Sequence, residues 1–210
     1  MSKTIKKILS IIFAFLLLSM TCLPCYAVEN STVDISWDES VLINYTPFYT
    51  DAGADARGTY PGRFGAQFPR MLVTTDGTWY IAYTIYRNNG YLADPNGGNE
   101  LQISRSTNEG KTWEDIAIIS DPGRDLDNAQ MLELSNGEIL LACRSVIWQQ
   151  SYKLPVYKSS DGGYTWTYHS TIDEIHGAAG ELGNPDRGVY EPFMVQINDS
   201  TIGVMYASEK

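Results

Sequence analysis

The sequence predicts an all-β fold, a β-propeller built from repeated four-stranded units. Three observations lead to this prediction. Beyond the first 27 residues the chain is rich in Tyr, Trp, Gly, Asn and Thr, and helical patterns are nearly absent. Gly and Pro separate short apolar runs throughout. One hairpin pattern then recurs three times, at a spacing that suits propeller blades with long loops.

The first 27 residues are expected to be a secretory signal peptide, which leaves 28–210 as the mature protein. Three lysines lie among the first seven residues, and an almost wholly apolar run follows from Ile8 to Met20. Cys25-Tyr26-Ala27 offers small residues where a signal peptidase cleaves. The apolar run is short for a transmembrane helix. We therefore expect a secreted, extracellular protein with no membrane partner after cleavage.

The charge and the cysteine content narrow the function further. The 210 residues carry a net charge of −10, and 28–210 would hold 12 Lys and Arg against 25 Asp and Glu. An acidic surface argues against nucleic acid and anionic membranes as partners. Only Cys143 would survive cleavage, so no internal disulfide is expected. The two histidines, His169 and His176, lack a metal-ligand spacing, and His176 falls in a polar segment expected to be a solvent-exposed loop. We expect no metal and no cofactor.

Each copy of the repeat is an apolar strand, a tight turn and a second apolar strand. The copies run over 69–83, 129–142 and 192–206, with turns at Asp76-Gly77, Asn136-Gly137 and Asn198-Asp199. Such residue pairs favour positive φ, which matches hairpin geometry. A methionine at the third position recurs 60 and then 63 residues along the chain, at Met71, Met131 and Met194.

A second signature follows two of these hairpins. Ser159 to Trp166 fits Ser-x-Asp-x-Gly-x-Thr-Trp at all five defined positions, and Ser106 to Trp113 fits at four, with Asn108 in place of Asp. We interpret both as β-turns in which Asp161 or Asn108 accepts hydrogen bonds from backbone N–H groups, while Gly takes the left-handed conformation. The signature lies on the outer edge of a blade. It therefore predicts a fold and not a catalytic group.

These repeats divide the mature chain into blades. Blade one is predicted over about 66–118, blade two over about 126–170, and an incomplete blade three over about 188–210. Residues 33–50, which include Val41-Leu42-Ile43, are expected to form a strand that closes the ring. About two and a half blades leave open sheet edges. The chain is therefore expected to be the N-terminal part of a larger propeller.

Propellers place their sites around the central channel, so the polar residues at the start of each inner strand are the candidates. Glu191 stands out because it directly precedes an apolar strand and Pro192 fixes the backbone beside it. Its aromatic neighbours can form a wall on which a sugar stacks. An ion pair across the channel, with Arg70 or Arg144, is an equally good interpretation of Glu191. The other polar candidates at the inner strands are Asp127, Asn128 and Gln130.

The order of motifs over about 65–210 resembles the exo-arabinanases of glycoside hydrolase family 93. The matching elements are Phe68-Pro69-Arg70, Asn136 to Arg144, Ser159 to Trp166, and Gly188 to Phe193. The resemblance implies a six-bladed propeller of sialidase type that releases short units from α-1,5-arabinan with retention. It implies that Glu191 is the catalytic nucleophile, with its acid/base partner beyond residue 210. It implies a substrate-binding role for the residues around Glu191: Arg70, Arg144, Asn128 and Tyr190.

Two alternatives to an arabinan glycosidase remain open. An exo-α-sialidase shares the turn signature, but it binds the sialate carboxylate with three arginines and attacks with Tyr. Arg70 could be the first of those arginines, although Pro69 precedes it where an Arg-Ile-Pro order is expected, and Asp94 is the candidate acid/base residue. The other alternative is a non-catalytic carbohydrate-binding propeller. All three readings give the chain an oligosaccharide or polysaccharide partner.

Overall fold

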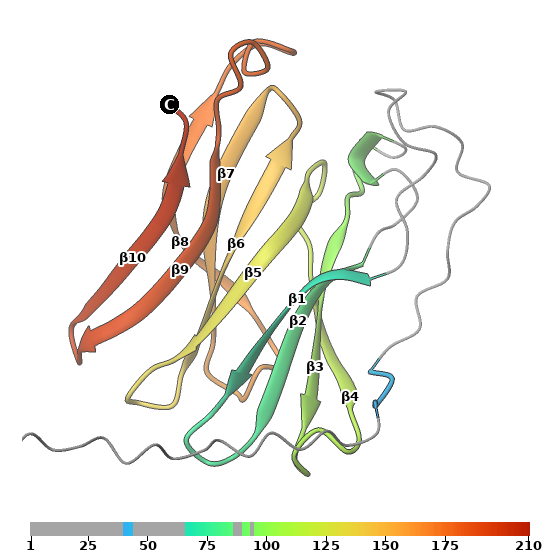
Figure 1. Cartoon of the computed structure of the whole chain (residues 1–210), viewed down its shortest axis with the longest axis vertical. Helices are drawn as coiled ribbons and strands as arrows, with labels where there is room; N and C mark the ends of the chain where they lie inside the picture. The colour runs from blue at the N-terminus through green and yellow to red at the C-terminus, as the bar shows by residue number, and fades with distance from the viewer. Residues whose placement is uncertain (1–39, 44–65, 86–89, 93–94) are drawn as a thin grey trace, which may run out of the picture. The chain divides into compact units, whose positions relative to one another are not determined.

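A computed structural model describes residues 40–43, 66–85, 90–92 and 95–210. Within those ranges the chain has ten β-strands and one short 3-10 helix, η1 (Gly90–Leu92), so the all-β prediction is confirmed (Figure 1). No helix in the described ranges is long and apolar enough to cross a membrane. The predicted signal peptide and Asp94 lie outside the described residues. Of the strand predicted within 33–50 only 40–43 are described, and these residues are not in a strand.

The strands form two four-stranded antiparallel meanders and one hairpin. The first sheet has the order β1 (Ala66–Val73), β2 (Trp79–Ile85), β3 (Glu100–Ser106) and β4 (Glu114–Ile119). The second sheet has the order β5 (Asp125–Glu133), β6 (Ile139–Ile147), β7 (Ser151–Ser159) and β8 (Thr167–His176). The hairpin consists of β9 (Val189–Asn198) and β10 (Thr201–Ser208). Strand β8 ends at His176, so the loop expected there is wrong, whereas the expected exposure is confirmed: the His176 side chain is 53% exposed.

The three predicted hairpin turns are all present. Gly77 and Gly137 have φ of 84° and 82°, which glycine adopts without steric cost, and they follow Asp76 and Asn136. Gly77 donates its N–H to Thr74 O at 2.9 Å, and Gly137 donates to Leu134 O at 2.9 Å. At the third turn, the Asn198 side chain accepts the N–H of Ser200 at 2.9 Å. The repeat found in the sequence is thus a repeat of structure.

The two outer turns share one set of hydrogen bonds. Asp161 Oδ1 accepts the N–H of Thr165 at 2.9 Å, and Asn108 Oδ1 accepts that of Thr112 at 2.9 Å. The indole N–H of Trp166 bonds to Gly163 O at 2.8 Å, and that of Trp113 bonds to Gly110 O at 2.9 Å. All these side chains are engaged locally, which agrees with the structural role predicted for them.

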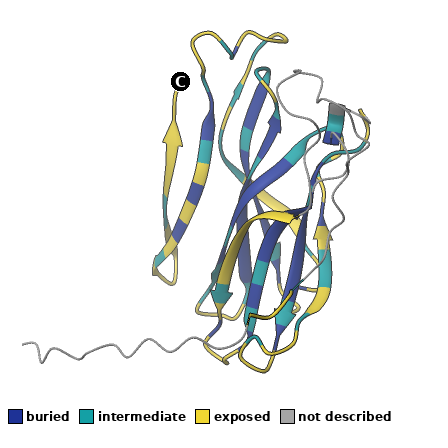
Figure 2. Cartoon of the chain, turned by 45° about the vertical axis from the view of Figure 1, so that its right-hand side comes forward, coloured by how far each residue is buried: buried dark blue, intermediate teal, exposed yellow. Residues whose placement is uncertain are grey.

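The apolar core lies between successive sheets. Leu101 and Ile103 of the first sheet pack with Met131 and Leu141 of the second. A similar cluster joins the second sheet to Met194 of the hairpin. Figure 2 shows that β6 and β7 are buried along most of their length, whereas β10 is largely exposed. Met131 and Met194 are buried, but Met71, at the same position of the first sheet, is 56% exposed.

At both junctions between sheets, a residue in the first turn of one sheet donates a hydrogen bond to an inner-strand side chain of the next sheet. We call this contact the latch. The N–H and hydroxyl of Thr75, in the β1–β2 turn, donate to the Glu133 carboxylate at 2.8 and 3.1 Å. One repeat later, the N–H of Ser135 donates to Gln196 Oε1 at 2.9 Å. Glu133 and Gln196 each stand two residues after the repeated methionine. The sheets are therefore joined by the same polar contact as well as by the apolar core.

Candidate functional site

The innermost strand of each sheet carries one extra residue at the same place. Pairing shifts by one between Gln67 and Arg70 in β1, between Asp127 and Gln130 in β5, and opposite Tyr190 and Phe193 in β9. Each shift is a β-bulge, which bends the strand and re-aims a side chain. The residue that begins each bulge has positive φ: 54° at Phe68, 51° at Asn128 and 50° at Glu191.

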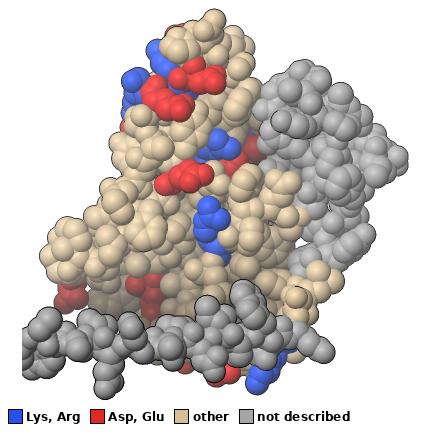
Figure 3. Space-filling view, viewed as in Figure 1, with Lys and Arg blue, Asp and Glu red and all other residues tan. Residues whose placement is uncertain are grey.

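The three bulges bring residues of three strands to one groove. Strand β1 lies beside β5, and β5 beside β9. The groove has a cavity volume of about 320 Å³. It is lined from the three strands by Arg70, Met71, Asn128, Ala129, Gln130, Glu191, Pro192 and Phe193. Figure 3 shows acidic and basic groups gathered over the middle of this face of the molecule. Three of the five predicted site residues line the groove together.

Glu191 is the single carboxylic acid among the described residues that line this groove. It is exposed, although it lies within a strand and precedes a buried proline. In the described part of the chain its carboxylate forms neither a hydrogen bond nor an ion pair, so the ion pair with Arg70 or Arg144 weighed for it does not form. A carboxylate on a rigid strand with no protein partner is available to a ligand.

Arg144 and Tyr190, the other two predicted site residues, are not among the residues that line the groove. Arg144 donates from Nε to Asp127 Oδ1 at 2.7 Å, and its Nη2 pairs with Oδ2 of the same carboxylate. Its guanidinium carbon lies 5.3 Å from the centre of the Tyr190 ring. Burial alone would lower the pKa of Arg144. The hydrogen bonds to Asp127 and the negative charge of Asp127 have the larger combined effect, so the pKa of Arg144 is raised. Burial also raises the pKa of Tyr190, whose ring packs edge-on against Tyr152. Arg144 thus contacts Asp127 of β5 and Tyr190 of β9 from its place on β6.

The polar residues that do line the groove differ in how they are engaged. Gln130 accepts the Met194 N–H at 2.9 Å and donates to Met131 O at 2.7 Å, so it joins β5 to β9. Arg70 is exposed, and its guanidinium donates to Pro69 O at 3.1 Å. Asn128 is only 9% exposed, and no described residue forms a hydrogen bond with its buried Oδ1. Arg70 and Asn128 are therefore available to a ligand, whereas Gln130 has a structural role because it joins two strands.

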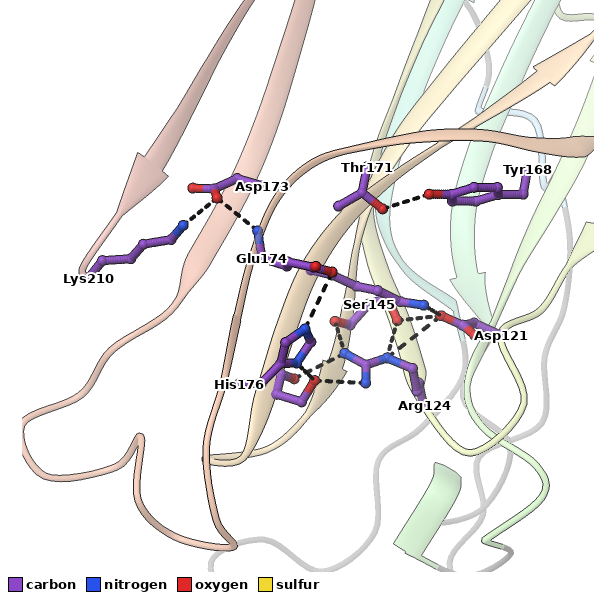
Figure 4. A network of polar contacts seen from close by, with 11 residues as sticks. Asp121, Arg124, Ser145, Tyr168, Thr171, Asp173, Glu174, His176 and Lys210 are labelled. Carbon is purple, nitrogen blue, oxygen red and sulfur yellow. Dashed lines mark hydrogen bonds and ion pairs between the residues drawn. The ribbon is translucent and has the colours of Figure 1, made fainter.

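A second polar network involves β6, β7 and β8 (Figure 4). Arg124 donates to Ser145 Oγ at 2.6 Å and to Ser151 Oγ at 2.9 Å, and Ser151 also contacts His176 Nδ1 at 2.7 Å. Burial lowers the pKa of Arg124. The side chains of this network form hydrogen bonds with one another, which indicates a structural role. Across the described ranges no group of three or more His, Cys, Asp or Glu side chains could hold a metal ion.

Comparison with known proteins supports the fold. No family model and no curated protein sequence matches the chain. Among solved structures it is similar to an α-L-arabinofuranosidase of family 93 from Fusarium graminearum complexed with arabinobiose, at 26% identity and a TM-score of 0.55 over 67% of this chain and 40% of that one. A mutant α-L-arabinofuranosidase from Fusarium graminearum in complex with an iminosugar inhibitor aligns at 27% identity and a TM-score of 0.52, over 63% of this chain and 38% of that one. The chain has a sialidase-type β-propeller fold.

More distant structures share this propeller fold. An α-L-arabinanase of Penicillium chrysogenum complexed with arabinobiose aligns at 22% identity and a TM-score of 0.55, over 78% of this chain and 45% of that one. A protein of unknown function from Dyadobacter fermentans aligns at 14% identity and a TM-score of 0.52, over 81% and 41%. The chain thus spans less than half the length of these propellers. Within the described residues it has two four-stranded sheets and one two-stranded hairpin.

Proposed function

We propose that this chain belongs to a secreted, exo-acting glycoside hydrolase that cleaves arabinan with retention, and that Glu191 is its nucleophile. The observation that carries the proposal is the free, exposed Glu191 carboxylate, held on a strand bulge in a groove formed by three inner strands. The motif order and the arabinobiose complexes of the similar propellers support arabinan as the substrate.

The charge of the groove favours a neutral glycan over a sialoside. A sialidase holds the sialate carboxylate with three arginines. Here one guanidinium, that of Arg70, lies among the described lining residues, and Glu191 opposes its charge. Arg144 donates from Nε and Nη2 to Asp127, whose carboxylate balances its charge. Arabinan, which has no charged groups, fits this groove better.

Retaining hydrolysis needs a second carboxyl about 5–5.5 Å from the first. The nucleophile attacks the anomeric carbon, and the second group protonates the leaving oxygen. Because Glu191 is the sole acid among the described groove residues, the proposal places the partner on another blade of the ring. The exposure of Met71 supports a neighbouring blade, since its equivalents Met131 and Met194 are buried against the preceding sheet.

The direct test is turnover by the full-length protein. Linear arabinan and sialyllactose are digested with the wild type and with Glu191→Ala, and products are separated by thin-layer chromatography. We expect short arabinose units from the wild type alone, with a loss of several orders of magnitude in the variant. Azide should restore part of the turnover as a glycosyl azide. Normal turnover by the variant would contradict the assignment of Glu191.

A non-catalytic glycan-binding propeller is the second candidate, favoured by the presence of only one carboxylate among the described groove residues. This candidate predicts saturable binding of arabinobiose with no product from the whole gene product. Release of sialic acid in place of arabinose would support neither candidate and would contradict the inference from groove charge.

A further inference from the structure

Among the described residues, the side-chain oxygen of Asn128 has no hydrogen-bond partner. Asn128 is a lining residue of the groove on β5 and is only 9% exposed, and its Oδ1 is buried away from any partner that the structure describes. Buried amide groups in proteins are almost always hydrogen-bonded. A half-turn about the Cβ–Cγ bond exchanges the oxygen and the NH2 group, so the amide can offer either end to an occupant of the groove.

The backbone alone does not explain an asparagine at this position. Asn128 has φ of 51°, a conformation that asparagine tolerates and glycine adopts freely. The equivalent bulge of β1 places Phe68 at φ 54°, so the bulge accepts an apolar residue as well. A backbone requirement would therefore be met by several residues. What asparagine adds is the amide, on a residue that lines the same groove as Glu191.

We infer that the Asn128 amide binds a hydroxyl group of a neutral sugar that occupies the groove beside Glu191, and so helps to determine specificity. The inference rests on the proposed function, because it assigns the ligand of the same groove. A hydroxyl both donates and accepts, so it satisfies the amide in either orientation. A sugar carboxylate satisfies only the NH2 end, and it would be repelled by the Glu191 carboxylate. The residue therefore selects for hydroxyl-rich, uncharged glycans.

The test compares two glycine variants for binding of arabinobiose, measured by isothermal titration calorimetry on the whole gene product. Asn128→Gly removes the amide without backbone strain, and we expect a Kd at least tenfold higher than that of the wild type. Phe68→Gly is the matched control, since it is the same change at the same bulge of β1 and Phe68 is not among the groove residues. It should leave the Kd unchanged. Circular dichroism checks that both variants fold.

A set of monodeoxy arabinobioses identifies the hydroxyl. For one member of the set, wild type and Asn128→Gly should bind with the same Kd, because the hydroxyl that the amide holds is missing. The inference is overturned if Asn128→Gly binds arabinobiose like the wild type, if no monodeoxy sugar removes the difference, or if the wild type binds no neutral sugar.

This experiment separates the inference from the proposed function. Amide-dependent binding without hydrolysis of arabinan would leave the inference standing and contradict the proposed hydrolase. Hydrolysis of arabinan combined with normal binding by Asn128→Gly would leave the hydrolase standing and contradict the inference.

Discussion

Asn128 and Glu191 occupy the same position in consecutive blades. Each begins the bulge of an inner strand, with φ of 51° and 50°, and each lines the same groove. Phe68 is the third member of the series, with φ of 54°. A left-handed conformation costs a non-glycine residue roughly 1–2 kcal/mol. One backbone geometry is thus used to present different side chains around one site, and such strain is typical of functional positions.

The latch between the blades gives a first prediction. Glu133→Ala removes the carboxylate that accepts two hydrogen bonds from Thr75, and we expect it to lower the free energy of unfolding by about 0.5–1.5 kcal/mol in urea titrations. Glu133→Gln is the matched control, because the chain itself uses Gln196 in the equivalent latch. The Gln variant should stay close to the wild type. Equal losses in both variants would show that the carboxylate acts by its charge and not through the latch geometry.

The outer turn at Asp161 predicts a dependence of stability on pH. Hydrogen bonds from the hydroxyl and N–H of Thr165, and then from Ser159, lower the pKa of Asp161 from 3.8 to about 2. The folded state therefore favours the carboxylate. This contribution is complete above about pH 4 and is lost as the pH falls toward 2. We expect Asp161→Asn to lack this decrease in the free energy of unfolding at low pH. Urea unfolding of both proteins between pH 2 and 5 measures the difference.

The equivalent turn provides the reciprocal experiment. Asn108 makes the same backbone contact without a titrating group. Asn108→Asp should therefore introduce a loss of stability below about pH 4 that the wild-type turn lacks. An NMR titration that places Asp161 at 3.8 would contradict both expectations.

Most of the fold could be predicted from the sequence, because its signals are local. Tight turns with Asp-Gly and Asn-Gly, alternating apolar strands and the Ser-x-Asp-x-Gly-x-Thr-Trp signature each depend on a few adjacent residues. The strands of both blades and the hairpin at Asn198 follow from them. The end of β8 at His176 was missed because its sequence, Asp173 to His176, is polar on an exposed edge strand and gives no apolar alternation.

The site was predicted less completely, because its geometry depends on contacts between distant segments. Their positions at the inner strands led to the expectation that Arg70, Asn128 and Glu191 lie together, and the three residues line one groove; their roles stay predictions. The pairing of Arg144 with Asp127 across β5 and β6 depends on strand register, and no sequence signal marks it. The bulges were also missed. The sequence signal for two of these bulges is the proline that follows Phe68 and Glu191, because proline cannot donate a hydrogen bond to a neighbouring strand.

Cys143 provides a prediction about the core. The thiol is fully buried, and burial raises its pKa well above the ordinary value. A buried, protonated thiol is a poor nucleophile. We expect no reaction with iodoacetamide in the folded protein and full reaction in concentrated urea, measured by mass spectrometry on the peptide that holds Cys143. Rapid labelling without denaturant would show that the interface between blades one and two opens readily.

The left-handed Glu191 gives the last prediction, which separates strain from chemistry. Three variants all remove the carboxylate: Glu191→Gly, Glu191→Asn and Glu191→Ala. Glycine has no Cβ to clash at φ 50° and asparagine tolerates that region, whereas alanine keeps the clash. We expect Gly and Asn to raise the free energy of unfolding by about 0.5–1 kcal/mol, after the entropy that glycine costs, and Ala to leave it nearly unchanged.

All three variants should lose turnover of arabinan together, because none can attack the anomeric carbon. A gain in stability that accompanies loss of activity is the behaviour expected of a strained functional residue. If Gly and Asn were instead no more stable than Ala, the conformation of Glu191 would carry no strain, and the bulge would be explained by packing of Pro192 and Met194 alone. Differential scanning calorimetry on the four proteins decides between these outcomes.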